Sequence, residues 1–367
     1  MQQYPYPAYR PVPPRPVVTD EMIRQNEKRK LRSKSNGLGF LILTYYSTLQ
    51  VSAIGIVLLF QAFGISIASN HVAEYLLDIA ASVFAALIPG LIYLGASGYR
   101  LRDSFKNTHV TPTLLIPLVL LGMGCSMVAN LLTQLFINNI SLFGLENHAG
   151  SIETTSHNPL EIILSTIAIA IVPAFAEEFV FRGIVLGSLK KYGSAFAVVV
   201  SSIMFSAMHS NTTQIVFVFF LGTVFGIVDV IADSIVPSLV LHFLNNFFAA
   251  LMDLLVNSKV LDENTTYTLY YLVTLLFCIG GFFSFLYLYK TKRDIFRFTN
   301  KEKPEYHYAE KLTLKDKYNA FFVNAGMMIS MSIFLLMTIL NFFPQSSCYV
   351  RGKSIHARGT GDGAGGV

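Results

Sequence analysis

The sequence predicts an all-α polytopic membrane protein, built as a bundle of about eight or nine transmembrane helices. Of its 367 residues, 53% are hydrophobic and 13% are charged, whereas a soluble domain carries about 25% charged residues. The mean hydropathy is +0.52. The apolar residues also gather in runs of about 20, the length that an α-helix needs to cross a bilayer. Together these observations argue against a soluble enzyme.

Nine apolar segments follow one another along the chain. They span residues 40–66, 74–96, 113–137, 159–179, 195–209, 214–232, 235–256, 268–289 and 319–343. The last of them is the weakest prediction, because it would place a basic C-terminal tail outside the cell.

The basic residues predict how these segments are oriented. Six of them lie between Arg24 and Lys34, and further groups follow the second, fourth and eighth segments, whereas the intervening loops contain one lysine, Lys259. Because basic loops stay in the cytoplasm, we expect an integral, multi-pass protein with a cytoplasmic N-terminus. The membrane is expected to be that of a bacterial cell. The expected partner of the basic residues is the lipid bilayer, not a nucleic acid.

Glu177, Glu178 and Arg182 lie just after the apolar run from Ile162 to Phe175. Ionisable groups in or near hydrocarbon are costly and indicate a functional site. On a helix, Glu178 and Arg182 are four residues apart and can pair on one face. Glu177 is turned from Glu178 by about 100° and is free for chemistry. The alternative is that these charges only mark a cytoplasmic helix end.

Two histidines and an asparagine lie further along the chain. His209 comes late in its apolar segment, with Phe205 one turn before it, and His242 lies four residues before Asn246 on one helix face. A lone histidine in a membrane usually hydrogen-bonds a neighbouring helix. Three polar sites in one part of the chain are a stronger indication. We therefore expect Glu177, His209, His242 and Asn246 to converge.

Such a set of side chains supports hydrolysis in two ways. A carboxylate and a histidine can deprotonate water, while a second histidine and an amide stabilise the oxyanion. Alternatively, Glu177, His209, His242 and Asn246 could hold a divalent metal such as zinc that activates the water. The sequence leaves both open, although the His-Glu-x-x-His signal of ordinary zinc peptidases is absent.

The motifs Glu-Glu-x-x-x-Arg at 177–182, Phe-x-x-x-His at 205–209 and His-x-x-x-Asn at 242–246 occur in this order. Together they resemble the motifs of the intramembrane endopeptidases related to the CAAX prenyl protease, called the CPBP or Abi family. That family also includes bacteriocin-processing and bacteriocin-immunity proteins. The resemblance covers roughly residues 155–260.

The resemblance implies a protease that cleaves a peptide bond of a membrane-associated protein or peptide. It implies that Glu177 and His209 activate the water, and that His242 and Asn246 stabilise the oxyanion or bind metal. Glu178 and Arg182 would hold the site together, and Phe205 would pack there or contact the substrate. The resemblance does not decide between a metalloprotease and a metal-free glutamate mechanism.

We divide the chain into six regions. These are a disordered Pro/Tyr-rich and then basic cytoplasmic tail (1–39), N-terminal transmembrane helices (40–154), a catalytic helical core (155–290), a basic cytoplasmic loop (291–318), a final transmembrane helix (319–343) and a flexible C-terminal tail (344–367). The proline-rich tail cannot bury a core, but it could bind a partner.

Two other functions stay open. A non-catalytic family member would act as a bacteriocin-immunity factor or as a membrane scaffold or regulator. A transporter would carry repeated, broken helices in two halves of the chain, and the sequence shows no such repeat.

The predicted topology conflicts with a converged site. Glu177 would lie near the inner membrane face, whereas His209 would lie roughly 20 Å from it at 1.5 Å per residue. We therefore expect residues 183–194 to form an interfacial helix that dips into the bilayer. The site would then open to the cytoplasmic side.

Overall fold

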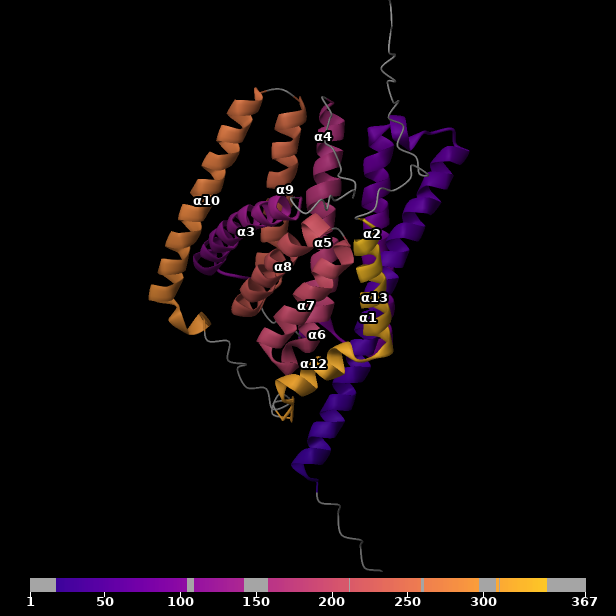
Figure 1. The fold of residues 1–367 in the computed structure, drawn as a ribbon, viewed down its shortest axis with the longest axis vertical. Helices are drawn as coiled ribbons and strands as arrows, with labels where there is room; N and C mark the ends of the chain where they lie inside the picture. The colour runs from indigo at the N-terminus through magenta and orange to yellow at the C-terminus, as the bar shows by residue number, and fades with distance from the viewer. Residues whose placement is uncertain are drawn as a thin grey trace, which may run out of the picture.

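The computed structural model describes residues 18–103, 109–141, 158–210, 212–258, 261–296, 308–309 and 311–341. These residues form helices and turns and contain no strand (Figure 1). The predicted all-α class is therefore confirmed. The proline-rich segment, much of the basic loop and the C-terminal tail lie outside the described residues.

The long helices follow the apolar segments of the sequence. Their bounds are α1 (Asp20–Ala62), α2 (His71–Ser97), α3 (Pro112–Ser141), α4 (Pro159–Thr166), α5 (Val172–Glu178), α6 (Gly187–Leu189), α7 (Ser194–His209), α8 (Thr212–Ala232), α9 (Val236–Ser258), α10 (Glu263–Thr291), α12 (Leu314–Phe322) and α13 (Ala325–Leu340). Helix α1 begins well before the first apolar run, because Thr19 caps it by accepting a hydrogen bond from the Met22 amide. The basic residues between Arg24 and Lys34 are therefore helical.

Within the described residues, seven helical segments are long and apolar enough to cross a membrane. Helices α12 and α13 meet at a bend of 72° and would form an eighth span if counted as one. This agrees with the lower of the two predicted numbers. Of the nine expected segments, 195–209 corresponds to α7, whose 16 residues fall short of the roughly 20 that a span needs. The chain is an integral, multi-pass membrane protein.

The segment Pro159–Tyr192 is one helical rod with two wide turns. Between α4 and α5 lies the π-helical stretch η3 (Ile167–Ile171), and between α5 and α6 lies a second one, η4 (Phe179–Leu186). Such π-helical turns are frequent at functional sites. The rod ends at Gly193, whose φ of 120° is a conformation that favours glycine.

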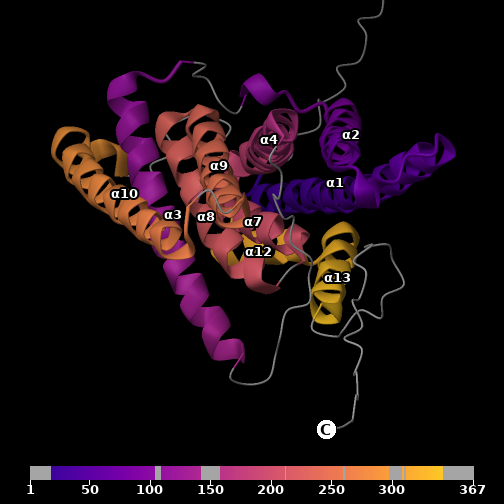
Figure 2. The same ribbon diagram turned by 90° about the horizontal axis from the view of Figure 1, so that it is seen from above.

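The helices that carry the predicted site lie in the middle of the molecule. Seen from above, α8 and α9 lie between the α3–α10 pair and the α1–α2 pair (Figure 2). Helix α7 packs against α8 and against the second π-helical stretch, and α9 packs against α5 and the first one. The site residues of α5, α7 and α9 are therefore enclosed by other helices.

Residues 183–194 differ from the expected interfacial helix. Residues 183–192 continue the central rod, and Ile184, Val185 and Leu186 are fully buried. Helix α7 covers them, and Ser201 on that helix donates a hydrogen bond of 2.8 Å to the Phe181 carbonyl. These apolar residues therefore face protein and not lipid, a pairing of distant segments that periodicity alone does not reveal.

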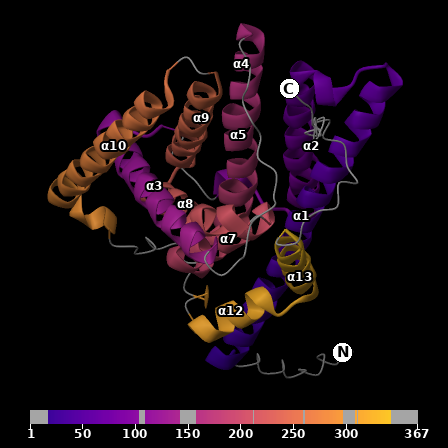
Figure 3. The same ribbon diagram turned by 45° about the horizontal axis from the view of Figure 1, so that its top comes forward.

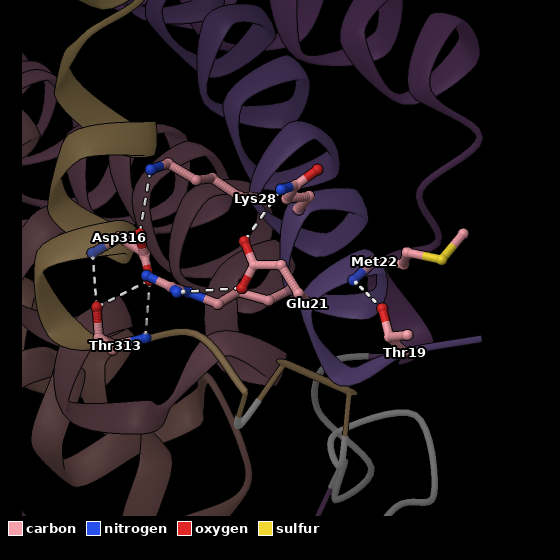
Figure 4. Close-up of polar contacts among 8 residues, drawn as sticks. Thr19, Glu21, Met22, Lys28, Thr313 and Asp316 are labelled. Atoms are coloured by element: carbon pink, nitrogen blue, oxygen red, sulfur yellow. Dashed lines mark hydrogen bonds and ion pairs between the residues drawn. The ribbon is translucent and has the colours of Figure 1, made fainter. Parts of the chain in front are cut away.

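Helix α12 lies across the N-terminal end of α1, close to the end of the central rod (Figure 3). Its Asp316 accepts hydrogen bonds from Arg24 at 2.8 Å and Lys28 at 3.1 Å. Thr313 and Asp316 form a capping box at the start of α12 (Figure 4). One carboxylate thus both caps α12 and binds it to α1.

Candidate active site

The central rod brings Glu177, Glu178 and Arg182 to the middle of the molecule. Glu178 ends α5, and Arg182 lies in the π-helical stretch that follows it. The Arg182 Nε lies 3.3 Å from Glu178 Oε2, and both side chains are buried. The pairing expected from their four-residue spacing is present even though the turn between them is wide.

Three aromatic and backbone contacts hold the Arg182 side chain. Its guanidinium lies over the Phe205 ring at 4.6 Å and over the Phe225 ring at 5.4 Å. Its Nη2 donates to the Gly222 carbonyl at 3.4 Å. A methyl group on Gly222 would lie 3.5 Å from that nitrogen and 3.1 Å from Phe205. The lack of a side chain at this position therefore lets α8 approach the arginine closely.

His242 lies between the two carboxylates. Its Nδ1 is 2.9 Å from Glu178 Oε1, and its Nε2 is 3.7 Å from Glu177 Oε2. The Glu178 side chain has no exposed surface, whereas that of Glu177 is 16% exposed. Glu178 is thus held by Arg182 and His242, and Glu177 is the carboxylate that remains accessible.

The Phe205 ring contacts both His209 and His242. The rings of His209 and Phe205 are 5.0 Å apart, and those of Phe205 and His242 are 6.0 Å apart. The His209 Nδ1 is 2.9 Å from the Phe205 carbonyl oxygen. A carbonyl only accepts, so Nδ1 carries the hydrogen and Nε2 of the neutral ring is an acceptor. Within the described residues, no hydrogen bond or ion pair joins His209 to Glu177.

Asn246 lies one turn after His242 on α9 and is half-buried. Its Nδ2 donates to the Ile169 carbonyl of the first π-helical stretch at 3.1 Å. Its Oδ1 accepts from Asn245 Nδ2 at 3.3 Å. The amide therefore bridges α9 and the central rod.

Three polar residues near the site were not among those singled out in the sequence. Asp229, fully buried on α8, accepts a hydrogen bond of 3.0 Å from the Ser238 backbone amide, one turn before His242. An acidic residue inside an apolar segment is itself a signal of function, so Asp229 could have been found. Asn245 adjoins Asn246 in the motif, whereas Ser126 on α3 has no sequence signal.

The metal alternative depends on how Glu177, His209, His242 and Asn246 are placed. Among the residues that the structure describes, no group of three or more His, Cys, Asp or Glu side chains is arranged to hold a metal ion. The Nδ1 atoms of His209 and His242 contact the Phe205 carbonyl and Glu178, which leaves the Nε2 atom of each ring as the nitrogen that a metal would take. We assign no step to a metal.

The remaining geometry fits activation of water by side chains. An accessible carboxylate, an acceptor nitrogen on His209 and an imidazole anchored by a buried carboxylate are components of general acid–base catalysis. The buried charges lie in surroundings of low dielectric constant, where such groups act more strongly than in water.

Comparison with known proteins finds a family similarity in the helices that carry the site. Residues 159–248 match the family model described as type II CAAX prenyl endopeptidase Rce1-like. No curated protein and no solved structure matches the chain. The matched segment runs from α4 into α9 and contains every predicted site residue. Residues 159–248 are thus similar to the CAAX prenyl protease-related (CPBP) family of intramembrane proteases, which are hydrolases.

Proposed function

We propose that this protease hydrolyses a peptide bond of a membrane-associated protein or peptide with a water molecule activated by Glu177. The observation that carries the proposal is the unequal burial of the two neighbouring carboxylates. Glu178 is enclosed by Arg182 and His242, whereas Glu177 keeps 16% exposure. A general base must be within reach of its water, and of the two only Glu177 is accessible.

In the proposed reaction, Glu177 takes a proton from water while the water oxygen attacks the carbonyl carbon of the scissile bond. His209 assists by accepting a hydrogen bond at Nε2, since its Nδ1 donates to Phe205. The carbon–nitrogen bond then breaks, and the proton held by Glu177 passes to the leaving amine. Atoms and charge balance without a further reactant.

His242 and Asn246 are proposed to stabilise the oxyanion. The 3.7 Å between His242 Nε2 and Glu177 exceeds a normal hydrogen bond, so Glu177 leaves Nε2 open to a substrate oxygen, to which Nε2 donates when it carries a hydrogen. Asn246 has a second amide hydrogen beyond the one given to Ile169. Loss of one such donor typically costs about 10²–10³ in kcat.

We further propose that the end of the molecule bearing the N-terminus of α1 faces the cytoplasm. Arg24 and Lys28 of α1 meet Asp316 at this end. Lys191, at the end of the central rod, approaches Glu27 of α1 at 4.0 Å. Several basic segments of the chain thus gather on one side, as the positive-inside rule requires of a cytoplasmic face.

The test is a cleavage assay with protein in liposomes and a pool of membrane-associated peptides, prenylated and not. Wild type is expected to cut, and Glu177→Ala is expected to lose at least about 10²-fold in rate. Glu161→Ala is the matched control, because Glu161 lies in the first turn of α4 at the far end of the same rod. If wild type cuts nothing while a cellular phenotype still requires Glu177, the non-catalytic immunity or scaffold role replaces the protease.

A further inference from the structure

A chain of three hydrogen bonds runs from α3 through the motif asparagine to the first π-helical stretch. Ser126 on α3 donates to Asn245 Oδ1 at 2.5 Å, Asn245 Nδ2 donates to Asn246 Oδ1 at 3.3 Å, and Asn246 Nδ2 donates to the Ile169 carbonyl at 3.1 Å. Ser126 and Asn245 are both buried. Ser126 lies outside the segment that matches the family model, so nothing in that match assigns it a role.

The Ile169 carbonyl fixes the direction of the whole chain. A backbone carbonyl only accepts, so Asn246 must present its nitrogen to Ile169 and its oxygen to Asn245. Asn245 must then present its nitrogen to Asn246, which leaves its oxygen to accept from Ser126. Because Ser126 supplies the last donor, an alanine there would leave a buried amide oxygen without a partner, which is costly in hydrocarbon surroundings.

Ser126 differs from two other buried hydroxyl groups of the helices. Thr133, also buried on α3, donates to the carbonyl of Ala129 in its own helix, and Ser202 on α7 likewise donates to Val198. Each of those two bonds stays within one helix and holds no side chain of another helix. The hydroxyl of Ser126 instead crosses to α9, which indicates a role in holding Asn245.

We propose that Ser126 and Asn245 are positioning residues that fix the amide of Asn246, so that its second N–H points at the reacting carbonyl. This rests on the proposed function for the reaction, but the orientation of the amide can be measured separately. When Asn245 loses its Ser126 donor and shifts, the Asn246 amide is held by the Ile169 carbonyl alone. Its second N–H is then no longer fixed in the direction of the reacting carbonyl.

The first measurement is the cleavage rate of Ser126→Ala, with Thr133→Val as the matched control that removes one buried hydroxyl from the same helix. Ser126→Ala is expected to lower kcat about tenfold with KM unchanged, since it misplaces a group that acts in the transition state. Thr133→Val is expected to keep the wild-type kcat. Ser126→Thr, which keeps the hydroxyl, is expected to restore most of kcat and covers the case in which the alanine variant folds poorly.

The second measurement is the side-chain amide NMR signal of Asn246 in asparagine-labelled protein, assigned by its loss in Asn246→Asp. The signal is expected to shift in Ser126→Ala and not in Thr133→Val. If the Asn246 signal does not move in Ser126→Ala, the inference is overturned, whether or not kcat falls. It is also overturned if the wild type cuts and Ser126→Ala cuts with the same kcat. If wild type does not cut but the signal shifts, the proposed function fails and the positioning of Asn246 stands.

Discussion

Arg182 and Glu178 have no exposed surface, so each charge depends on the other to remain in the protein interior. Replacing Arg182 by alanine would remove the guanidinium that pairs with Glu178 and would also empty the space over Phe205 and Phe225. Breaking a buried ion pair from one side typically costs about 3–5 kcal/mol. We therefore expect Arg182→Ala to lower the yield of folded protein and its Tm strongly, as measured by thermal unfolding in detergent.

Arg29→Ala is the control for that experiment, because Arg29 contacts Asn26 of its own helix at an exposed site. Its Tm should match that of the wild type. Arg182→Lys should fall between the two, since lysine keeps the charge but lacks the planar group that lies over both rings. An Arg182→Ala protein as stable as Arg29→Ala would show that the pair does not stabilise the core.

The contact between Glu178 and Arg182 could be predicted from the sequence. Glu178 and Arg182 are neighbours along one helix, so their contact follows from local geometry. The chain from Ser126 through Asn245 was not predictable, because it depends on which face α3 turns toward α9. A serine in an apolar helix usually bonds its own backbone, and nothing in the sequence distinguishes Ser126 from such a residue.

At the scale of helices, α1 and α13 approach through glycine. A methyl group on Gly39 would lie 2.3 Å from a backbone carbon of Gly326, which is too close for two carbon atoms. A side chain at Gly39 would therefore force the backbones of α1 and α13 apart. Asn36 also accepts a hydrogen bond of 2.7 Å from the Gly326 amide. Small residues allow this kind of close packing in membranes. We expect Gly39→Ala to lower Tm and to loosen α13 from α1.

Gly55→Ala is its counterpart on the same helix, because a methyl group there meets no atom within 4 Å. Alanine has the higher helix propensity, so this change should leave Tm unchanged or raise it slightly. Proteolysis of the α12–α13 region would report the separation directly. If both alanine variants unfold at the same temperature, the close approach of α1 and α13 is not a stabilising contact.

The spans and their order could be predicted from apolar runs, but their internal geometry could not. Residues 183–194 looked like an interfacial helix because Lys190 and Lys191 follow a short apolar stretch. In the structure α7 covers Ile184 and Leu186. The π-helical turns leave no periodic mark in the sequence.

For the whole molecule, the proposed orientation makes a prediction about accessibility. Ser69 lies in the turn between α1 and α2, at the opposite end of the molecule from α12, where Lys315 lies (Figure 1). Both side chains are exposed. In a background with serine at Cys125, Cys278 and Cys348, Ser69→Cys should react with an impermeant thiol reagent on intact cells. Lys315→Cys should react only after the membrane is opened. The reverse pattern would invert the topology and would place the N-terminus outside.

The assignment of separate roles to Glu177 and Glu178 is tested most directly by kcat and Tm of two isosteric variants, Glu177→Gln and Glu178→Gln, measured side by side in liposomes. Glu177→Gln should lose about 10²–10⁴ in kcat, the usual contribution of a general base, at nearly unchanged Tm, since that side chain is partly exposed. Glu178→Gln should lower Tm, because it leaves Arg182 buried without its partner. The account is contradicted if Glu177→Gln cuts at the wild-type rate, or if Glu178→Gln loses activity with its Tm intact.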